Sequence, residues 1–302
     1  MTKSITKASI SGILAIDKPS GISSYDVIRQ LKKKLGTKKM GHCGTLDPLA
    51  SGLLIVCIGD ATKFASYIEN DTKEYVAGIQ LGISTTTYDA EGEILSKNLV
   101  NFAPHTLAQT LEKFQGEISQ TPPAFSALKI NGTPAYKLAR KGLDVSLKSR
   151  KVVIHNLTLL EQKTDRLILR VTCSKGTYIR SLAHDIGKEL GCGAFLDYLQ
   201  RTKIGSFTLE NASPPDVTEE ILQKSLQDAR LALSKIPVLL INEEYKDAIR
   251  TGKILYPEFF YNFPNLIETS GIYKIQTEDE IILAIVEIQE DKKIKYKRVL
   301  IT

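Results

Sequence analysis

One acid of this chain stands in a loop whose composition would hold it rigidly. Asp47 lies in residues 41–52, which read Gly-His-Cys-Gly-Thr-Leu-Asp-Pro-Leu-Ala-Ser-Gly. Three glycines and a proline predict a loop, because glycine tolerates positive φ and proline cannot extend a central strand. Pro48 also biases the backbone of Asp47 toward an extended conformation. The pattern predicts either a reactive carboxylate on a rigid loop or, as a plainer alternative, an aspartate that caps a turn.

The same loop holds a second pair of groups with chemical potential, His42 and Cys43. A thiol beside an imidazole is the arrangement used by cysteine nucleophiles. Neighbouring residues of an extended chain point to opposite sides, however, and no third group that would orient the imidazole is indicated. The sequence therefore favours Asp47 over Cys43 as the reactive group.

Apolar patterns on both sides of the loop predict the elements that position Asp47. Residues 53–58 form a continuous apolar run of strand length, which is typical of a strand buried on both faces. Residues 12–16 predict a short buried strand, and a helix is expected from residues 23–26 to about Leu35. In residues 73–82, apolar side chains recur at every second position from Tyr75, which indicates a half-buried strand.

The segment 41–52 resembles the motif of the TruB family of pseudouridine synthases, Gly-His-Thr-Gly-Thr-Leu-Asp-Pro-Leu-Ala-Thr-Gly. Cys43 and Ser51 stand where that family usually has threonine. Residues 174–180, Ser-Lys-Gly-Thr-Tyr-Ile-Arg, are a second specific match, and residues 196–205 resemble a third motif. Residues 17–21, residues 85–92 and the Pro-Pro-x-x-Ser-Ala-Leu-Lys segment also match, with Phe125 in place of the family's tyrosine. The resemblance covers most of the chain.

The resemblance assigns roles to individual residues. It implies that Asp47 is the nucleophile and that an ion pair with Arg180 keeps it ionised. Tyr75, which as a strand tyrosine would ordinarily be packing, is implied to stack on the flipped base and to act as a general base. For Lys18, a structural role beside a carboxylate and a role at the site stay equally open. The resemblance places the remaining substrate-binding residues at His42, which would fill the space the base leaves, and at Tyr178, Leu199 and Lys18.

The reaction implied by the resemblance isomerises uridine to pseudouridine at position 55 in the T-loop of tRNA. It breaks the C1′–N1 bond, rotates the base and rejoins it through C5, so that no cofactor and no metal are expected. A carboxylate suits this reaction because it can attack as a nucleophile or stabilise positive charge at C1′. Whether Asp47 attacks C1′ or C6 stays open.

The distribution of charge agrees with a polyanionic partner such as tRNA. The net charge of +6 is modest, but basic residues gather within residues 29–39, 137–151 and 292–298. One such cluster is usually a solvated face, whereas three together indicate phosphate contacts. The second cluster falls in a segment, about 120–151, that forms an RNA-binding insertion in the family. The residues expected to contact the RNA backbone there are Lys129, Lys137, Arg140 and Lys141.

The chain is long enough for a large domain and a second, smaller one. The expected fold is mixed α/β: a catalytic domain over residues 1–235 around a large mixed sheet, then a small β-rich domain over 236–302. By resemblance the second is a PUA-like RNA-binding module. Before it, the pattern predicts one polar helix from Thr218 to about Leu233.

The four cysteines show no paired spacing, which is typical of reduced thiols. The sequence has no apolar run of 18 residues and no secretory signal, so we expect a cytoplasmic protein without a membrane span. A monomer is expected. Two other functions are compatible with this architecture: a non-catalytic tRNA-binding or tRNA-folding protein, and a guide-RNA-dependent pseudouridine synthase. Loss of Asp47, Tyr75 or Arg180 would have favoured the first, and all three are present. The compact C-terminal segment and the Pro-Pro-x-x-Ser-Ala-Leu-Lys insertion favour the stand-alone bacterial type over the second.

Overall fold

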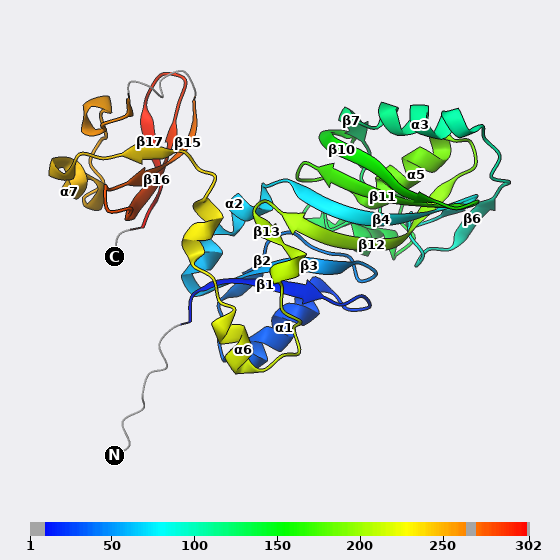
Figure 1. The fold of residues 1–302 in the computed structure, drawn as a ribbon, viewed down its shortest axis with the longest axis horizontal. Coiled ribbons are helices and arrows are strands. Elements are labelled where there is room, and N and C mark those ends of the chain that lie inside the picture. Colours follow the sequence, from blue (N-terminus) through cyan, green and yellow to red (C-terminus); the bar gives the residue numbers. More distant parts are fainter. Residues whose placement is uncertain (1–9, 264–269, 301–302) are drawn as a thin grey trace, which may run out of the picture. The chain divides into compact units, whose positions relative to one another are not determined.

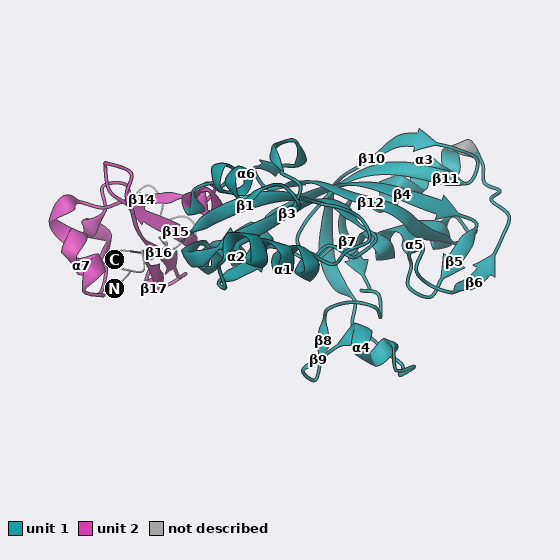
Figure 2. Ribbon diagram, turned by 90° about the horizontal axis from the view of Figure 1, so that it is seen from below, with its two compact units in different colours: residues 1–229 teal, residues 230–302 magenta. Residues whose placement is uncertain are grey.

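The computed structural model describes residues 10–263 and 270–300 and divides the chain into two compact units, residues 1–229 and 230–302 (Figure 1 and Figure 2). The expected domain boundary, between 235 and 236, lies a few residues further along the chain.

A nine-stranded mixed sheet forms the centre of the first unit, as the sequence predicted for the fold class. The main path of the sheet is β1-β3-β12-β4-β11-β10-β7, with β2 added to β3 and β13 to β12. Only the pairing of β12 with β3 is parallel. The strands are β1 (Gly12–Lys18), β2 (Met40–His42), β3 (Ser51–Ile58), β4 (Lys73–Leu81), β7 (Gly116–Gln120), β10 (Arg150–Gln162), β11 (Arg166–Cys173), β12 (Ala194–Ile204) and β13 (Phe207–Thr208).

Strand β3 is buried along almost its whole length, which agrees with its unbroken apolar sequence. Strand β4 lies between β12 and β11 and carries Tyr75 into the core cluster of the unit. These central strands therefore give the functional residues a rigid support. The remaining strands of this unit are the pairs β5 (Ile83–Thr85) with β6 (Ile94–Lys97) and β8 (Lys129–Ile130) with β9 (Thr133–Pro134).

Helix α1 (Ser24–Leu35) begins with a capping box, in which Ser23 and Asp26 satisfy each other's backbone N–H groups. Its apolar residues Val27, Ile28, Leu31 and Leu35 are buried. The other helices of the unit are α2 (Ala65–Glu69), α3 (Pro104–Lys113), α4 (Ala135–Ala139), α5 (Ile179–Glu189) and α6 (Glu219–Lys224), with 3-10 turns η1 (Gly59–Phe64) and η2 (Leu209–Asn211). The 3-10 turn η3 (Ala229–Leu233) spans the chain boundary between the two units.

The prediction of one helix from Thr218 to Leu233 was wrong. Helix α6 ends at Lys224, and the chain then forms a bridge with β1 before the short turn η3. In that bridge Ile13 N donates to Gln227 O at 2.9 Å and Gln227 N donates to Ile13 O at 2.8 Å. Pairing with a strand takes the amide of Gln227 out of a helix, so a tertiary contact overrides the local helical pattern.

The second unit contains a four-stranded sheet in the order β14-β15-β16-β17, and so a C-terminal β domain is present, as predicted. Its strands are β14 (Val238–Leu240), β15 (Gly271–Gln276), β16 (Ile282–Ile288) and β17 (Ile294–Val299). Short helical segments η4 (Glu243–Tyr245), α7 (Lys246–Arg250) and η5 (Pro257–Phe259) pack with it around a separate apolar core.

In the described part of the chain, no helix is long and apolar enough to cross a membrane. Nor do the described residues contain a group of three or more His, Cys, Asp or Glu side chains that could hold a metal ion.

Candidate active site

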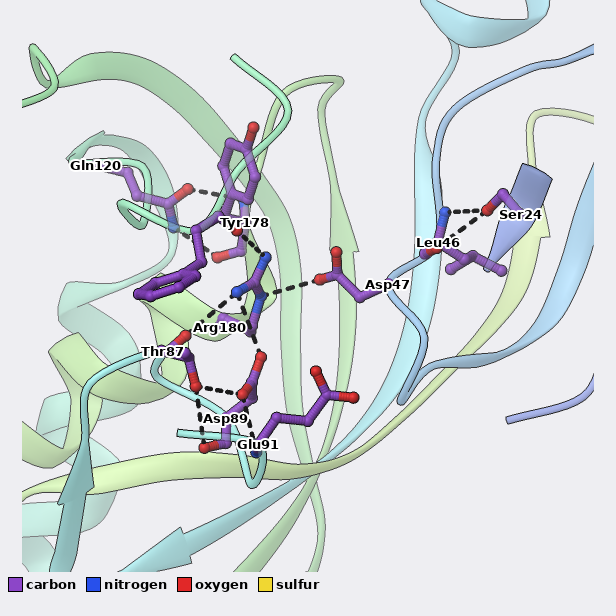
Figure 3. Close-up of polar contacts among 10 residues, drawn as sticks. Ser24, Leu46, Asp47, Thr87, Asp89, Glu91, Gln120, Tyr178 and Arg180 are labelled. Carbon is purple, nitrogen blue, oxygen red and sulfur yellow. Dashed lines mark hydrogen bonds and ion pairs between the residues drawn. The ribbon is translucent and has the colours of Figure 1, made fainter. Parts of the chain in front are cut away.

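The loop between β2 and β3 presents Asp47, and the segment after β1 holds this loop in place. The Ser24 hydroxyl accepts a hydrogen bond from Leu46 N at 2.8 Å and lies 3.0 Å from Leu46 O, to which it donates (Figure 3). Gly21 N donates to Pro48 O at 2.8 Å. The residues before and after Asp47 are thus both fixed to the start of the chain, which favours a rigid loop.

For Lys18 the sequence leaves a structural role and a substrate-binding role equally open, and its contacts favour the structural one. Its side chain is fully buried, and its ammonium group donates to the carbonyls of Pro19, Ile22 and Pro48. Three bonds use all the donors of a lysine. Burial lowers the pKa of Lys18 to about 8, and the negative charge of Asp47 partly opposes this decrease. Lys18 therefore supports the loop structurally and offers no free donor to a substrate.

Arg180 lies between two carboxylates, as Figure 3 shows. Its Nε is 2.9 Å from Asp47 Oδ2, and its Nη1 is 3.3 Å from Asp89 Oδ2. The backbone carbonyls of Thr87 and Phe125 accept from the same guanidinium at 3.2 and 2.9 Å. Arg180 is only 5% exposed, so this network fixes the arginine next to Asp47. The predicted partnership of Asp47 and Arg180 is present in the structure.

Asp89 is a site residue that the sequence does not predict, although its segment, residues 85–92, resembles the family's pattern. The Asp89 carboxylate is buried. It accepts a hydrogen bond from the Thr87 hydroxyl and another from the backbone N–H of Glu91, at 3.1 Å. A polar loop of this composition predicts turns, but only the fold brings the turn against Arg180.

The electrostatics of Asp47 reflect two opposing effects. Burial raises the pKa of the carboxyl group, while the Arg180 charge opposes the rise and the Asp89 charge adds to it. An opposite charge at this distance favours the ionised form of a carboxyl group. Arg180 therefore opposes protonation of Asp47.

A cavity of about 590 Å³ opens beside Asp47. Five predicted site residues line it: Asp47, Tyr75, Tyr178, Arg180 and Leu199. It also has a basic lining that the predicted site did not include, contributed by Lys73, Arg150, Lys151, Lys175 and Arg201. Apolar rings and a few charged groups around one cavity are typical of a ligand site.

Tyr75 lies on β4 and is 7% exposed. Burial raises its pKa to about 12, and the nearby Arg201 charge opposes this rise. Tyr178 stands immediately before α5, where its backbone N–H and C=O both bond to the buried side chain of Gln120, at 2.8 and 3.0 Å. The Arg150 guanidinium lies 5.0 Å from the centre of the Tyr178 ring. Gln120, which lies outside the motif segments, therefore fixes the backbone of Tyr178, and Arg150 lies beside its ring.

His42 is partly buried on β2 and does not line the cavity. Burial lowers its pKa, which favours the neutral imidazole, and its Nδ1 has no hydrogen-bond partner. Its proposed role in filling the space of a flipped base stays a prediction. Cys43 is buried with its sulfur 3.4 Å from that of Cys57. Their hydrogen bond and burial both raise the pKa of the Cys43 thiol, which argues against the cysteine nucleophile.

The four residues expected to contact the RNA backbone lie apart from the cavity. Lys129, Lys137, Arg140 and Lys141 are exposed and belong to β8, α4 and the turn after α4. Figure 2 shows this segment projecting from the rest of the first unit. None of the four has an ion pair with a carboxylate in the described part of the chain, so their charges are available for an external partner.

Comparisons with known proteins agree with this geometry. Residues 32–179 match the model of the TruB family pseudouridylate synthase (N terminal domain), and residues 180–236 match the tRNA pseudouridylate synthase B C-terminal domain. tRNA pseudouridine synthase B of Francisella tularensis subsp. novicida is 43% identical over 297 residues, which span 96% of this chain and 95% of that protein. The chain belongs to the TruB family. A relative of the same name from Francisella philomiragia is also 43% identical, over 96% of this chain and 95% of its own.

Solved structures of the family's wider fold align along nearly the whole chain. A chain of a Cbf5-Nop10-Gar1 complex superposes with a TM-score of 0.73 at 26% identity, covering 95% of this TruB-family chain and 84% of its own length. A chain of an H/ACA RNP bound to a substrate RNA containing 2′-deoxyuridine superposes with a TM-score of 0.71 at 24% identity. The alignment covers 96% of this chain and 85% of that one. The second likeness concerns the fold alone.

Proposed function

We propose that this protein isomerises uridine to pseudouridine in tRNA, at position 55 of the T-loop. The observation that carries the proposal is the ion pair of Asp47 and Arg180 at the wall of the cavity, on the two most specific motifs of the TruB family. Membership of the family gives the reaction class, and the position in tRNA is the finer part of the proposal.

The arrangement supports a reaction on a base that has left its stack. Unstacking a nucleotide costs about a few kcal/mol and requires a pocket that receives the base. Tyr75, Tyr178 and Leu199 offer apolar and aromatic surface in that pocket. Asp47 supplies the nucleophile or the counter-charge for a cationic C1′, and Arg180 keeps it ionised. The step is an isomerisation: the C1′–N1 and C5–H bonds break, the C1′–C5 and N1–H bonds form, and no electrons are gained or lost.

Exposed basic residues of the insertion and of the C-terminal unit would hold the tRNA by its phosphates. We also propose that the β-rich unit from about residue 236 is a PUA-like RNA-binding module. Lys295 of β17 is exposed. Contacts with phosphates position an RNA without reading its sequence.

Removing Lys137 and Arg140 together should weaken tRNA binding and flatten the dependence of log K on log salt. The slope should fall by about two units or less, at about 0.7–0.9 per phosphate contact. Binding titrations at several salt concentrations measure it. Lys113 and Lys163 already pair with Glu189 and Glu161, so a double Gln variant of these two is the matched control. An unchanged slope in the insertion variant would place this segment away from the RNA.

Two substitutions at Tyr75 should separate a catalytic tyrosine from one that only packs. Tyr75→Phe keeps the ring and should leave tRNA binding intact, while a step that uses the phenol as base should slow by about 10²-fold or more. Tyr75→Leu also removes the aromatic face and should weaken capture of the flipped base by about 1–3 kcal/mol. Melting temperatures and single-turnover rates of both variants are the measurement. A fully active Phe variant together with a destabilised Leu variant would mean that Tyr75 only packs.

The test of the proposed function uses the purified protein and an unmodified tRNA transcript, without any guide RNA. Digestion to nucleosides should show pseudouridine approaching about one per tRNA at long times, because one pocket takes one uridine. Binding without conversion would support the tRNA-folding alternative. Conversion that appears only when a guide RNA is added would support the guide-dependent alternative.

A further inference from the structure

Arg201 is the largest side chain that the first unit buries almost completely. It stands in the segment 196–205 that resembles a family motif, but the resemblance gave it no role and the reaction described above does not use it. It lies on β12 and is 1% exposed. No carboxylate pairs with it among the described residues. A buried cation without a carboxylate partner is costly, because neutral dipoles replace its hydration incompletely. The groups that contact the Arg201 guanidinium therefore indicate the role of this buried charge.

The guanidinium of Arg201 connects the two ends of the loop that carries Asp47. Its Nη2 donates to Gly44 O at 3.1 Å, and its Nε donates to Leu53 O at 2.8 Å. Gly44 precedes Asp47 by three residues and Leu53 follows it by six. The guanidinium reaches the two carbonyls with two different nitrogens at a fixed spacing, whereas a lysine would have to reach both with one nitrogen.

The backbone of Arg201 lies against the same loop. Arg201 is the register partner of Gly52 in the parallel pairing of β12 with β3. Gly52 has a φ of +94°, and a Cβ atom there would stand 2.4 Å from Arg201 O. The end of the loop therefore packs directly on the strand of Arg201, with no room for a side chain between them.

On its other side Arg201 faces the strand of Tyr75. The two residues are register partners in the antiparallel pairing of β12 with β4. Both line the cavity. Arg201 thus touches the Asp47 loop through β3 and lies beside Tyr75 through β4, since β12 runs between those two strands.

We infer that Arg201 is a positioning residue of the reaction, which holds the loop of Asp47 and the strand of Tyr75 in a fixed relation across the cavity. This inference rests on the proposed function. A misplacement of about 1 Å in a reacting group can cost about 10²-fold in rate. The effect of losing Arg201 should therefore fall on the chemical step, with little effect on tRNA binding.

The test compares Arg201→Met, Arg201→Lys and Arg166→Met. Arg166 pairs with Asp197 at 2.6 Å elsewhere on the sheet and does not line the cavity, so its loss controls for removing a structural arginine. With excess enzyme at saturation, Arg201→Met should lower the single-turnover rate per folded molecule by about 10²-fold. The dissociation constant for tRNA should stay within about threefold of the original. Arg201→Lys should recover part of the rate, because its ammonium restores the charge and can still donate to one of the two carbonyls.

Amide hydrogen exchange gives a readout that does not depend on turnover. In the free protein, the amides of residues 44–53 should exchange faster in Arg201→Lys than in Arg166→Met, because the ends of the loop are no longer connected. If Arg201→Met does not fold, the single-turnover rate and the amide exchange are both measured on Arg201→Lys. A rate per folded molecule equal to that of Arg166→Met, with unchanged exchange in the loop, would overturn the inference. That result would leave the proposed function standing, whereas an inactive parent protein would remove both.

Discussion

Replacing Asp47 by asparagine should abolish pseudouridine formation while tRNA binding stays within about tenfold of the parent protein. The amide keeps the size of the side chain but can neither attack carbon nor balance a positive charge at C1′. Binding should survive because the residues expected to contact the RNA backbone, Lys129, Lys137, Arg140 and Lys141, do not line the cavity. Single-turnover assays and filter binding on the same preparation measure the two effects separately.

Asp197→Asn is the matched control for this variant. Asp197 pairs with Arg166 and does not line the cavity, so its amide removes an ion pair of the sheet without touching the proposed chemistry. We expect the control to lower stability modestly and to retain its rate per folded molecule. Turnover by Asp47→Asn close to that of the control would contradict the role of Asp47.

The second large effect is expected at Arg180. Arg180→Met leaves Asp89, which is 4% exposed, without its charged partner and leaves Asp47 without the group that opposes protonation. Removing one partner of a buried ion pair typically costs about 3–5 kcal/mol of the free energy of unfolding. The rate should fall by about 10²-fold to 10³-fold or more, the scale for losing a fixed electrostatic group. Denaturant unfolding and single-turnover rates give both numbers, and Arg180→Lys should recover part of each.

The pH dependence of Arg180→Met follows from the raised pKa of Asp47. Without Arg180 this pKa should rise further, so the variant needs a higher pH to ionise the acid. The acid limb of its residual rate should therefore move to higher pH than in the parent. Its deficit in stability should be full above that pKa and shrink as the pH falls through it, because a protonated carboxyl needs no counter-charge. A deficit and an acid limb that match the parent at every pH would contradict this electrostatic role.

Much of the fold could be predicted because the decisive patterns are local. The apolar run at 53–58 predicts a strand buried on both faces, and β3 spans Ser51–Ile58. The alternation from Tyr75 predicts β4, and the serines at 23 and 24 predict the start of α1. The helix from Thr218 failed because Gln227 pairs with Ile13, more than two hundred residues away in the chain.

In the candidate site, too, some residues could be predicted from local sequence and others could not. Asp47, Tyr75 and Arg180 stand in segments that the family motifs mark, whereas their supports come from distant parts of the chain. Gln120 fixes the backbone of Tyr178, and Arg201 reaches the loop of Asp47 from another strand. Burial of such polar side chains is decided by sheet order and register, which no local pattern encodes. Lys18 illustrates the converse, since a lysine in a motif proves to be fully buried.

The central claim is that the Asp47 cavity converts one uridine of tRNA. Its most direct measurement is a nucleotide-resolved map of pseudouridine in a tRNA transcript, before and after incubation with the purified protein and with Asp47→Asn. We expect one new pseudouridine, at position 55 of the T-loop, with the parent protein and none with the variant. Pseudouridine elsewhere in the tRNA, or the same map with both proteins, would contradict the account.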